Sequence, residues 1–238
     1  MSLSRSRRWS ALRLAQTVAL ASWAGLFWFL LASDRTSLYL SSRTAWVVPL
    51  GAIALSIAAV GRLVTARTEE PQPLGSRAAW AVGFVLLPVV AILVLPPAAL
   101  GSYAASRRSL ASGLVSSAPS LEAGGRVTLA SVAAAGWSED ARRSLVRRAG
   151  SRVSFEGIVA RRDGQAADEF MLTRFIVSCC VADALSVQVR VVGAPPGRFD
   201  EDQWVRVSGA FYPVGKEVVV DASEIEPIPQ PDDPYLNV

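Results

Sequence analysis

The stretch "TVALASWAGLFWFLLA", residues 17–32, decides the fold class of this chain because it carries no charged residue. A helix on the surface of a soluble protein has a polar stripe, and this stretch has none. Together with its neighbours it forms an uncharged run from Leu14 to Ser33. A run of about 20 apolar residues is long enough to cross the core of a bilayer. The stretch therefore predicts a membrane-spanning helix.

Two further uncharged runs extend from Thr44 to Gly61 and from Ala78 to Ser106. We predict three spans, at about residues 12–33, 44–61 and 79–100. Pro96 and Pro97 lack a backbone donor, so the third helix is expected to kink or to end near Leu95. The alternative for the first run is a cleaved signal peptide behind "SRSRRW". An uncleaved helix is favoured because two more spans follow.

The distribution of arginine predicts how the spans are oriented. The N-terminal segment and the second loop are richer in arginine than the first loop, which carries Arg35 and Arg43 beside Asp34. Positively charged flanks stay in the cytoplasm. The sequence thus predicts a multi-pass protein of the cell membrane with a cytoplasmic N-terminus. Three crossings would make the C-terminal domain extracytoplasmic, although Arg107 and Arg108 on its near flank oppose this orientation.

Charge also divides the chain into two parts. Residues 1–150 contain 16 Arg and 6 acidic residues, whereas residues 151–238 contain 8 basic and 14 acidic residues, which gives net charges of about +10 and −6. The basic pI therefore belongs to the membrane part. An acidic, extracytoplasmic domain is a poor match to single-stranded nucleic acid, which requires a positive groove. We expect the lipid bilayer as a partner and no nucleic acid.

The C-terminal part has the pattern of a small β-barrel. Residues 107–136 have the composition of a linker and residues 137–150 that of a short helix, capped by Ser138 and ending at Gly150. Five segments of alternating or β-branched residues follow: 152–162, 169–179, 185–193, 203–213 and 216–228. With Gly157 and Gly209 placed for bends, they predict an all-β domain over residues 151–228, a five-stranded OB-like barrel, with an open sandwich as the alternative. Residues 229–238 are expected to form a Pro-rich tail.

The only two cysteines are adjacent, in "RFIVSCCVADAL" at residues 174–185, and the chain has no histidine. In a strand, neighbouring side chains point to opposite faces, so Cys179 and Cys180 can share one ion only if the backbone turns. A helical turn from Cys180 would bring its thiol and the Asp183 carboxylate to one face. Asp168 and Glu169 are more remote candidate ligands. Three interpretations stay open: buried apolar residues, a ligand site, or a redox pair.

These residues also carry a family resemblance. Arg174-Phe175, Cys179-Cys180 and Ala182-Asp183-Ala184, with the N-terminal spans and "VSFEGIVARR", resemble the YcgQ-like family of permease subunits. The resemblance implies a transport accessory role beside a separate integral membrane permease. It also makes Arg174, Cys180 and Asp183 the positions most worth testing. Metals are implied for some relatives, but the lack of histidine opposes a zinc site here.

An enzyme is not expected. The chain lacks histidine as a general base, paired acidic motifs and a phosphate-binding glycine loop. The main hypothesis is a membrane-anchored accessory subunit of a two-component permease, handling a soft metal ion or metalloid at Cys179, Cys180 and Asp183, with Arg174 as a further candidate. The alternatives are a protein that senses redox state or envelope stress through its thiols, and a purely structural envelope barrel.

Overall fold

The computed structural model describes residues 8–68, 70–95, 99–107, 126–215 and 217–237. The chain forms two compact units. The first comprises Met1–Thr36 and Thr44–Pro97, and the second comprises Ser37–Arg43 and Ala98–Val238. The seven residues Ser37–Arg43 lie in the loop between the first two long helices, yet they belong to the C-terminal unit.

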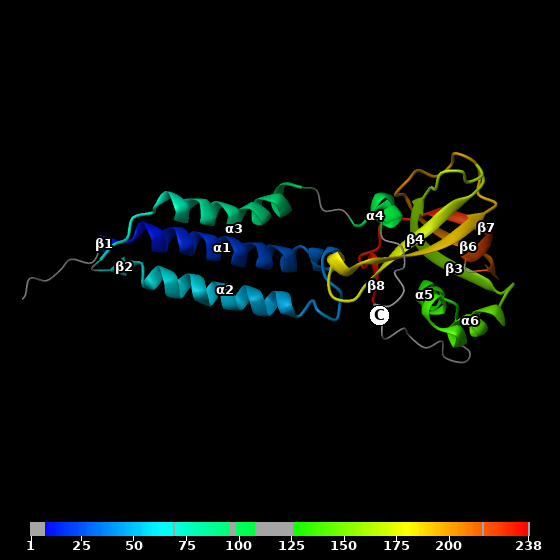
Figure 1. Ribbon diagram of the computed structural model, residues 1–238, viewed down its shortest axis with the longest axis horizontal. Coiled ribbons are helices and arrows are strands. Elements are labelled where there is room, and N and C mark those ends of the chain that lie inside the picture. The colour runs from blue at the N-terminus through cyan, green and yellow to red at the C-terminus, as the bar shows by residue number, and fades with distance from the viewer. Residues whose placement is uncertain (1–7, 69, 96–98, 108–125, 216, 238) are drawn as a thin grey trace, which may run out of the picture. The chain divides into compact units, whose positions relative to one another are not determined.

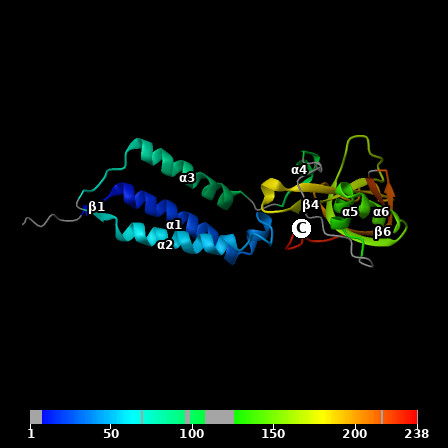
Figure 2. The ribbon, with the colours of Figure 1, turned by 60° about the horizontal axis from the view of Figure 1, so that its bottom comes forward.

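The first unit consists of three long helices, α1 (Ala11–Ala32), α2 (Val47–Val64) and α3 (Ser76–Val94), each long and apolar enough to cross a membrane. Figures 1 and 2 both show α1 and α2 side by side. α3 contains Pro88 and ends at Val94, ahead of Pro96 as expected, so it is shorter than the predicted span 79–100. Two short strands, β1 (Arg8–Trp9) and β2 (Arg67–Thr68), pair and join the N-terminal segment to the α2–α3 loop.

The second unit is built on a closed five-stranded barrel, as the sequence predicts. Its strands are β3 (Arg152–Ala160), β4 (Phe170–Val177), β5 (Leu185–Val192), β6 (Trp204–Val214) and β7 (Glu217–Pro227). The order β3-β6-β7-β5-β4 closes through a β3–β4 pairing, and only β5–β7 is parallel among these neighbours. This is the mixed, Greek-key arrangement of an OB-like barrel.

The barrel interior is filled by aliphatic and aromatic side chains that alternate with outward-facing ones. Phe155, Leu172, Val189, Val207 and Phe211 are among the fully buried members of this core. Side chains in a strand alternate between the two faces, which is why the period of two in the sequence identified the strands.

Gly157 and Gly209 allow neighbouring backbones to approach closely, as expected of the two bend positions. A Cβ atom on Gly157 would lie 2.6 Å from the Thr173 carbonyl oxygen, and one on Gly209 would lie 2.1 Å from that of Asp221. Gly209 also sits at a β-bulge in the β6–β7 pairing. A bulge or a close approach is the usual reason for a glycine inside a strand.

Two segments differ from the sequence-based boundaries. The expected linker 107–136 contains α5 (Leu129–Trp137), capped reciprocally by Thr128 and Ser131, and Leu129 and Ala133 are buried in the barrel core. The second helix of the pair, α6 (Glu139–Val146), is capped by Ser138, which accepts from the Ala141 N–H, as expected. The Ser-, Ala- and Gly-rich composition predicts a linker, and its residues 108–125 lie outside the described part of the chain. Small residues suffice where a helix packs closely.

The expected Pro-rich tail 229–238 contains a strand, β8 (Tyr235–Asn237), which pairs in parallel with Phe175–Val177 of β4. Tyr235 is buried, and its hydroxyl donates to the Leu38 carbonyl at 3.2 Å. Three residues are too few for a recognisable strand pattern. The prolines of the segment therefore predict a tail without a strand.

Gly209→Ala should lower the free energy of unfolding of the C-terminal unit by about 2 kcal/mol, because the new methyl group overlaps backbone that cannot move aside. Gly136→Ala in α5 is the control, since no atom lies within 4 Å of its Cβ position. Alanine there should be neutral or stabilising. Chemical denaturation of the full chain in detergent, followed by circular dichroism of the β-sheet, measures both. Equal stability of the two variants would contradict the close approach at Gly209.

Candidate functional site

The two cysteines lie just beyond the end of β4, in a tight turn held by Asp183. Residues Val181–Asp183 form a short 3-10 helix, η2, that begins after Cys180. The Asp183 carboxylate accepts from the backbone N–H of Ser178 at 3.0 Å and from that of Cys179 at 2.8 Å. The backbone therefore turns at the cysteines, as a shared site requires, and the carboxylate faces the turn itself.

The turn brings the two sulfur atoms together. The Sγ atoms of Cys179 and Cys180 are 3.7 Å apart, whereas an S–S bond is about 2.05 Å long. Cys179 is exposed and Cys180 is half-buried. The pair is therefore a vicinal dithiol with one sulfur open to solvent.

Asp183 tunes the exposed thiol. Its hydrogen bond with Cys179, together with the contact from Cys180, raises the pKa of Cys179 to about 11. Partial burial of Asp183 opposes its ionisation, but hydrogen bonds from Cys179, Ser178 and Cys180 outweigh it and hold the pKa of the carboxyl below its usual range. At neutral pH the site is thus a carboxylate beside a protonated thiol, and ligation or oxidation must release the thiol proton.

The same turn is joined to the loop between α1 and α2. Leu40 and Cys180 form an isolated antiparallel bridge. The Ser41 N–H donates to the Cys179 carbonyl at 3.1 Å, and the Val181 N–H donates to the Tyr39 carbonyl at 3.0 Å. The two bonds flank Cys180, so the backbone of the cysteine pair is part of this connection.

Arg174 lies in a different cluster. Its guanidinium donates to the carbonyls of Asp233 at 2.7 Å and Pro234 at 3.3 Å and lies 5.7 Å from the Trp204 ring centroid. It also approaches Glu156 at 3.9 Å. Burial lowers the pKa of Arg174, while Glu156 and Asp233 oppose that shift. Arg174 thus fastens the segment leading into β8 to the barrel.

The outer face of β4 and β5, the second and third strands of the barrel, is covered by the chain itself. In OB folds this face binds oligonucleotides and oligosaccharides. Here α4 (Ser102–Arg107) lies on it, with the Ala105 carbonyl accepting from Ser186 Oγ at 3.4 Å and Gln188 Nε2 at 3.5 Å. A second apolar cluster, including Ala105, Phe175 and Tyr235, fills the space beneath. The face is therefore part of the core.

The candidate ligands are only partly brought together. Cys179, Cys180 and Asp183 share one turn, whereas Asp168 and Glu169 precede β4 and lie at its other end. Within the described ranges, no three His, Cys, Asp or Glu side chains are arranged to hold a metal ion. A four-ligand zinc site is therefore not formed by that part of the chain. The turn offers two sulfur donors, with its carboxylate already engaged by backbone N–H groups.

Residues 117–237 match the DUF1980 C-terminal domain, which covers half of the chain. The chain belongs to the DUF1980 family. The match begins ahead of α5 and includes β8, so the helix pair and the C-terminal strand are parts of the DUF1980 domain. No curated protein matches the chain. The finer resemblance to the YcgQ-like permease subunits stays a prediction.

Two parts of the site in the DUF1980 chain were missed by sequence reasoning. For residues Ser37–Arg43 the sequence predicts only a short loop, because Leu38, Tyr39 and Leu40 are consecutive apolar residues without the alternation of a strand. The prolines around residues 235–237 predict an extended tail rather than the C-terminal strand β8. Both segments gain their structure only by pairing with β4 or its following turn, and such long-range pairing leaves little local signal.

Asp183→Asn should speed alkylation of Cys179 at pH 8, because it removes the carboxylate whose hydrogen bond and charge raise the pKa of the thiol. The comparison is made in a Cys180→Ala background, where Cys179 is the remaining thiol. The expected acceleration is on the order of tenfold, since each pKa unit changes the thiolate fraction tenfold. Rates with iodoacetamide, read by mass spectrometry, provide the measurement. Asp163→Asn, in an exposed turn, is the matched control and should leave the rate unchanged; equal rates in all three proteins would refute the role of Asp183.

Proposed function

We propose that this chain is a non-enzymatic, membrane-anchored accessory subunit of a two-component permease. Its DUF1980 domain would stand on the extracytoplasmic side, next to a separate integral membrane permease. The observation that carries the proposal is the joining of the α1–α2 loop to the barrel at Cys179–Val181. A domain built around a loop between two spans is suited to act beside the membrane rather than as a free ligand-binding module.

The covered β4–β5 face supports this interpretation. A barrel that recruits nucleic acid or sugar needs that face open, with aromatic side chains available for stacking. In this chain Phe175 of β4 and Tyr235 of β8 are buried there in one cluster with Ala105 of α4. The β4–β5 face of the barrel therefore serves as a scaffold rather than as a binding surface.

The long helices have the character of anchors. Each carries a single charged residue within a terminal turn: Arg13 in α1, Arg62 in α2 and Arg77 in α3. Ionisable side chains in the middle of spans mark ion and substrate pathways, and these helices have none. A transport pathway would then be supplied by the partner.

The pairings made by the segments between the long helices agree with three crossings of the membrane. The N-terminal segment pairs with the α2–α3 loop through β1 and β2, while the α1–α2 loop joins the C-terminal unit. Three spanning helices require these two groups on opposite sides. The arginine-rich N-terminal side is the cytoplasmic one by the charge rule, which would make the barrel extracytoplasmic.

The proposal extends to a soft metal ion or metalloid as the ligand of the dithiol. Two sulfur atoms 3.7 Å apart form a donor set that favours soft ions such as Cu(I) over zinc. Since ligation must displace the Cys179 proton, uptake should strengthen as pH rises. Further ligands would come from the partner permease.

Thiol redox sensing is the second candidate, and the same sulfur contact supports it. Oxidation would convert the two thiols into one disulfide, releasing two protons and passing two electrons to a low-molecular-weight disulfide as oxidant. A ring closed between adjacent residues distorts the intervening peptide, whose carbonyl accepts from Ser41. Alkylation that rises by two thiols per chain after reduction would favour this candidate, and unchanged labelling would exclude it.

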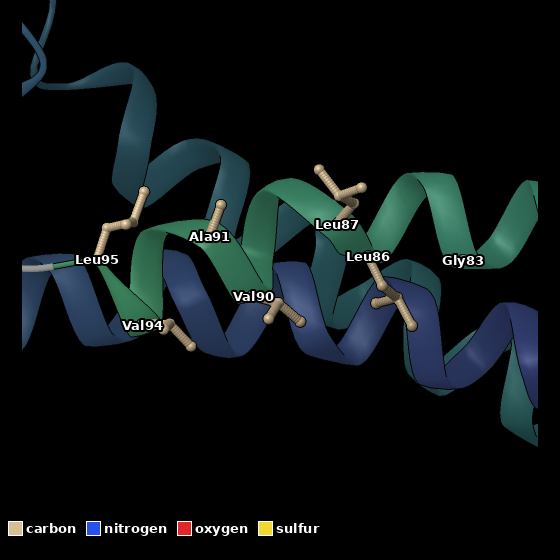
Figure 3. Close-up of a pocket in the computed structure, with 7 residues that line it drawn as sticks. All are labelled: Gly83, Leu86, Leu87, Val90, Ala91, Val94 and Leu95. Carbon is tan, nitrogen blue, oxygen red and sulfur yellow. The ribbon is translucent and has the colours of Figure 1, made fainter.

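α3 offers an apolar surface for the partner. A groove of about 470 Å³ runs along it between Leu86, Val90 and Val94 on one side and Leu87, Ala91 and Leu95 on the other, as Figure 3 shows. Gly83 lies at its end, and small residues let spans pack closely. Only 6% of the most apolar window of α3 is buried, against 22% in α1. We assign this face to a helix of the permease.

A photoreactive residue at Leu87 should cross-link the chain to a multi-span membrane protein in native membranes. The control position is Ile57 on α2, which is similarly exposed, at 68% against 61%, and should yield lipid adducts only. Cross-linked species are purified and identified by mass spectrometry, and the metal content of the same preparation is compared with that of Cys180→Ser. Lipid adducts alone at Leu87 would overturn the partner assignment, and equal metal content would overturn metal binding.

A further inference from the structure

A basic pocket on the C-terminal unit lies apart from the dithiol. It has a volume of about 840 Å³ and is lined by Arg126, Arg148 and Arg152 together with Ser151, Ser154 and Ser208. Among the residues that the structure describes, none that lines the pocket is acidic. The pocket is formed by the segment ahead of α5, the turn between α6 and β3, and the neighbouring strands β3 and β6.

The turn that carries two of the arginines is fixed in place by β6. The Gly150 N–H donates to the Phe211 carbonyl at 2.8 Å, and the Phe211 N–H donates to the Ser151 carbonyl at 3.2 Å. Gly150 has φ +80°, a left-handed conformation that suits glycine. Arg148 and Arg152 therefore flank a turn whose backbone is anchored to the barrel.

The hydroxyl groups lie on paired strands. Ser154 on β3 is in register with Ser208 on β6, and Ser208 Oγ donates to Ser154 Oγ at 3.2 Å. The nearest carboxylate in register, Glu224 on β7, lies opposite Ser208 and is outside the lining. The pocket thus gathers the guanidinium groups of Arg126, Arg148 and Arg152 beside hydroxyl groups of the barrel strands.

We propose that this pocket binds a phosphate group. Guanidinium groups present planar forks of N–H donors that match phosphate oxygens, and serine hydroxyls add donors of the same kind. Three guanidinium groups gathered in one pocket attract a dianion and repel cations. The phosphate can belong to a small soluble molecule or to the headgroup of an anionic lipid, because the same groups recognise either one.

The test uses the full chain in detergent at constant ionic strength. Binding of inorganic phosphate, of monomeric short-chain phosphatidylglycerol and of the matching phosphatidylcholine is measured by microscale thermophoresis. Arg148→Gln and Arg152→Gln should each weaken binding about tenfold, as expected for the loss of a charge-assisted hydrogen bond. Arg147→Gln is the matched control, because Arg147 is an exposed neighbour that does not line the pocket.

Binding of inorganic phosphate that depends on Arg148 and Arg152 would identify a soluble ligand. Binding of phosphatidylglycerol alone, with the same dependence, would identify a lipid headgroup. Either outcome supports the pocket, and raising the salt concentration should weaken both. No binding of either probe, a preference for phosphatidylcholine, or equal weakening in Arg147→Gln would overturn the proposal. Since neither the permease nor the dithiol takes part, failure here leaves the proposed function untouched.

Discussion

The architecture of the C-terminal unit depends on a few backbone hydrogen bonds around Cys180. The Ser41 N–H donates to the Cys179 carbonyl, and the Val181 N–H donates to the Tyr39 carbonyl. The two bonds lie on either side of the half-buried Cys180. Through these bonds Ser37–Arg43 joins the turn at Cys179–Val181, which lies more than a hundred residues away in sequence. Asp183 supports the pairing from the other side, because its carboxylate holds the N–H groups of Ser178 and Cys179.

The C-terminal segment reinforces the same region. Arg174 binds the carbonyls of Asp233 and Pro234, and the strand that follows extends the sheet beside β4. The Tyr235 hydroxyl then reaches the Leu38 carbonyl in the α1–α2 loop. Loop, barrel and C-terminus are thus linked around one strand end. Chemistry at the cysteine pair would act directly on that junction, whether the pair binds an ion or becomes oxidised.

The sequence predicts the regular elements well because their signals are local. The uncharged runs marked three helices, and the period of two marked all five barrel strands with the glycines of their close approaches. It also offered a turn from Cys180 that would bring its thiol to Asp183 as one alternative; the structure has a turn there, with the carboxylate on Cys179. It could not reveal the pairing of Leu40 with Cys180, the covering of β4 and β5 by α4, or the pairing of β8 beside β4. Those features arise from contacts between distant segments, whose short lengths carry no periodicity of their own. The sequence did not predict the basic pocket for the same reason, since Arg126, Arg148 and Arg152 are brought together only by the fold.

Hydrogen exchange of the full chain in detergent tests the central claim most directly. If the α1–α2 loop is a part of the barrel domain, the amides of Ser41 and Val181 should exchange slowly, with protection close to that of neighbouring barrel strands. Peptides that cover residues 37–43 and 178–184 report on both. Exchange at these two amides as fast as in an unstructured peptide, while β4 and β5 stay protected, would contradict the account.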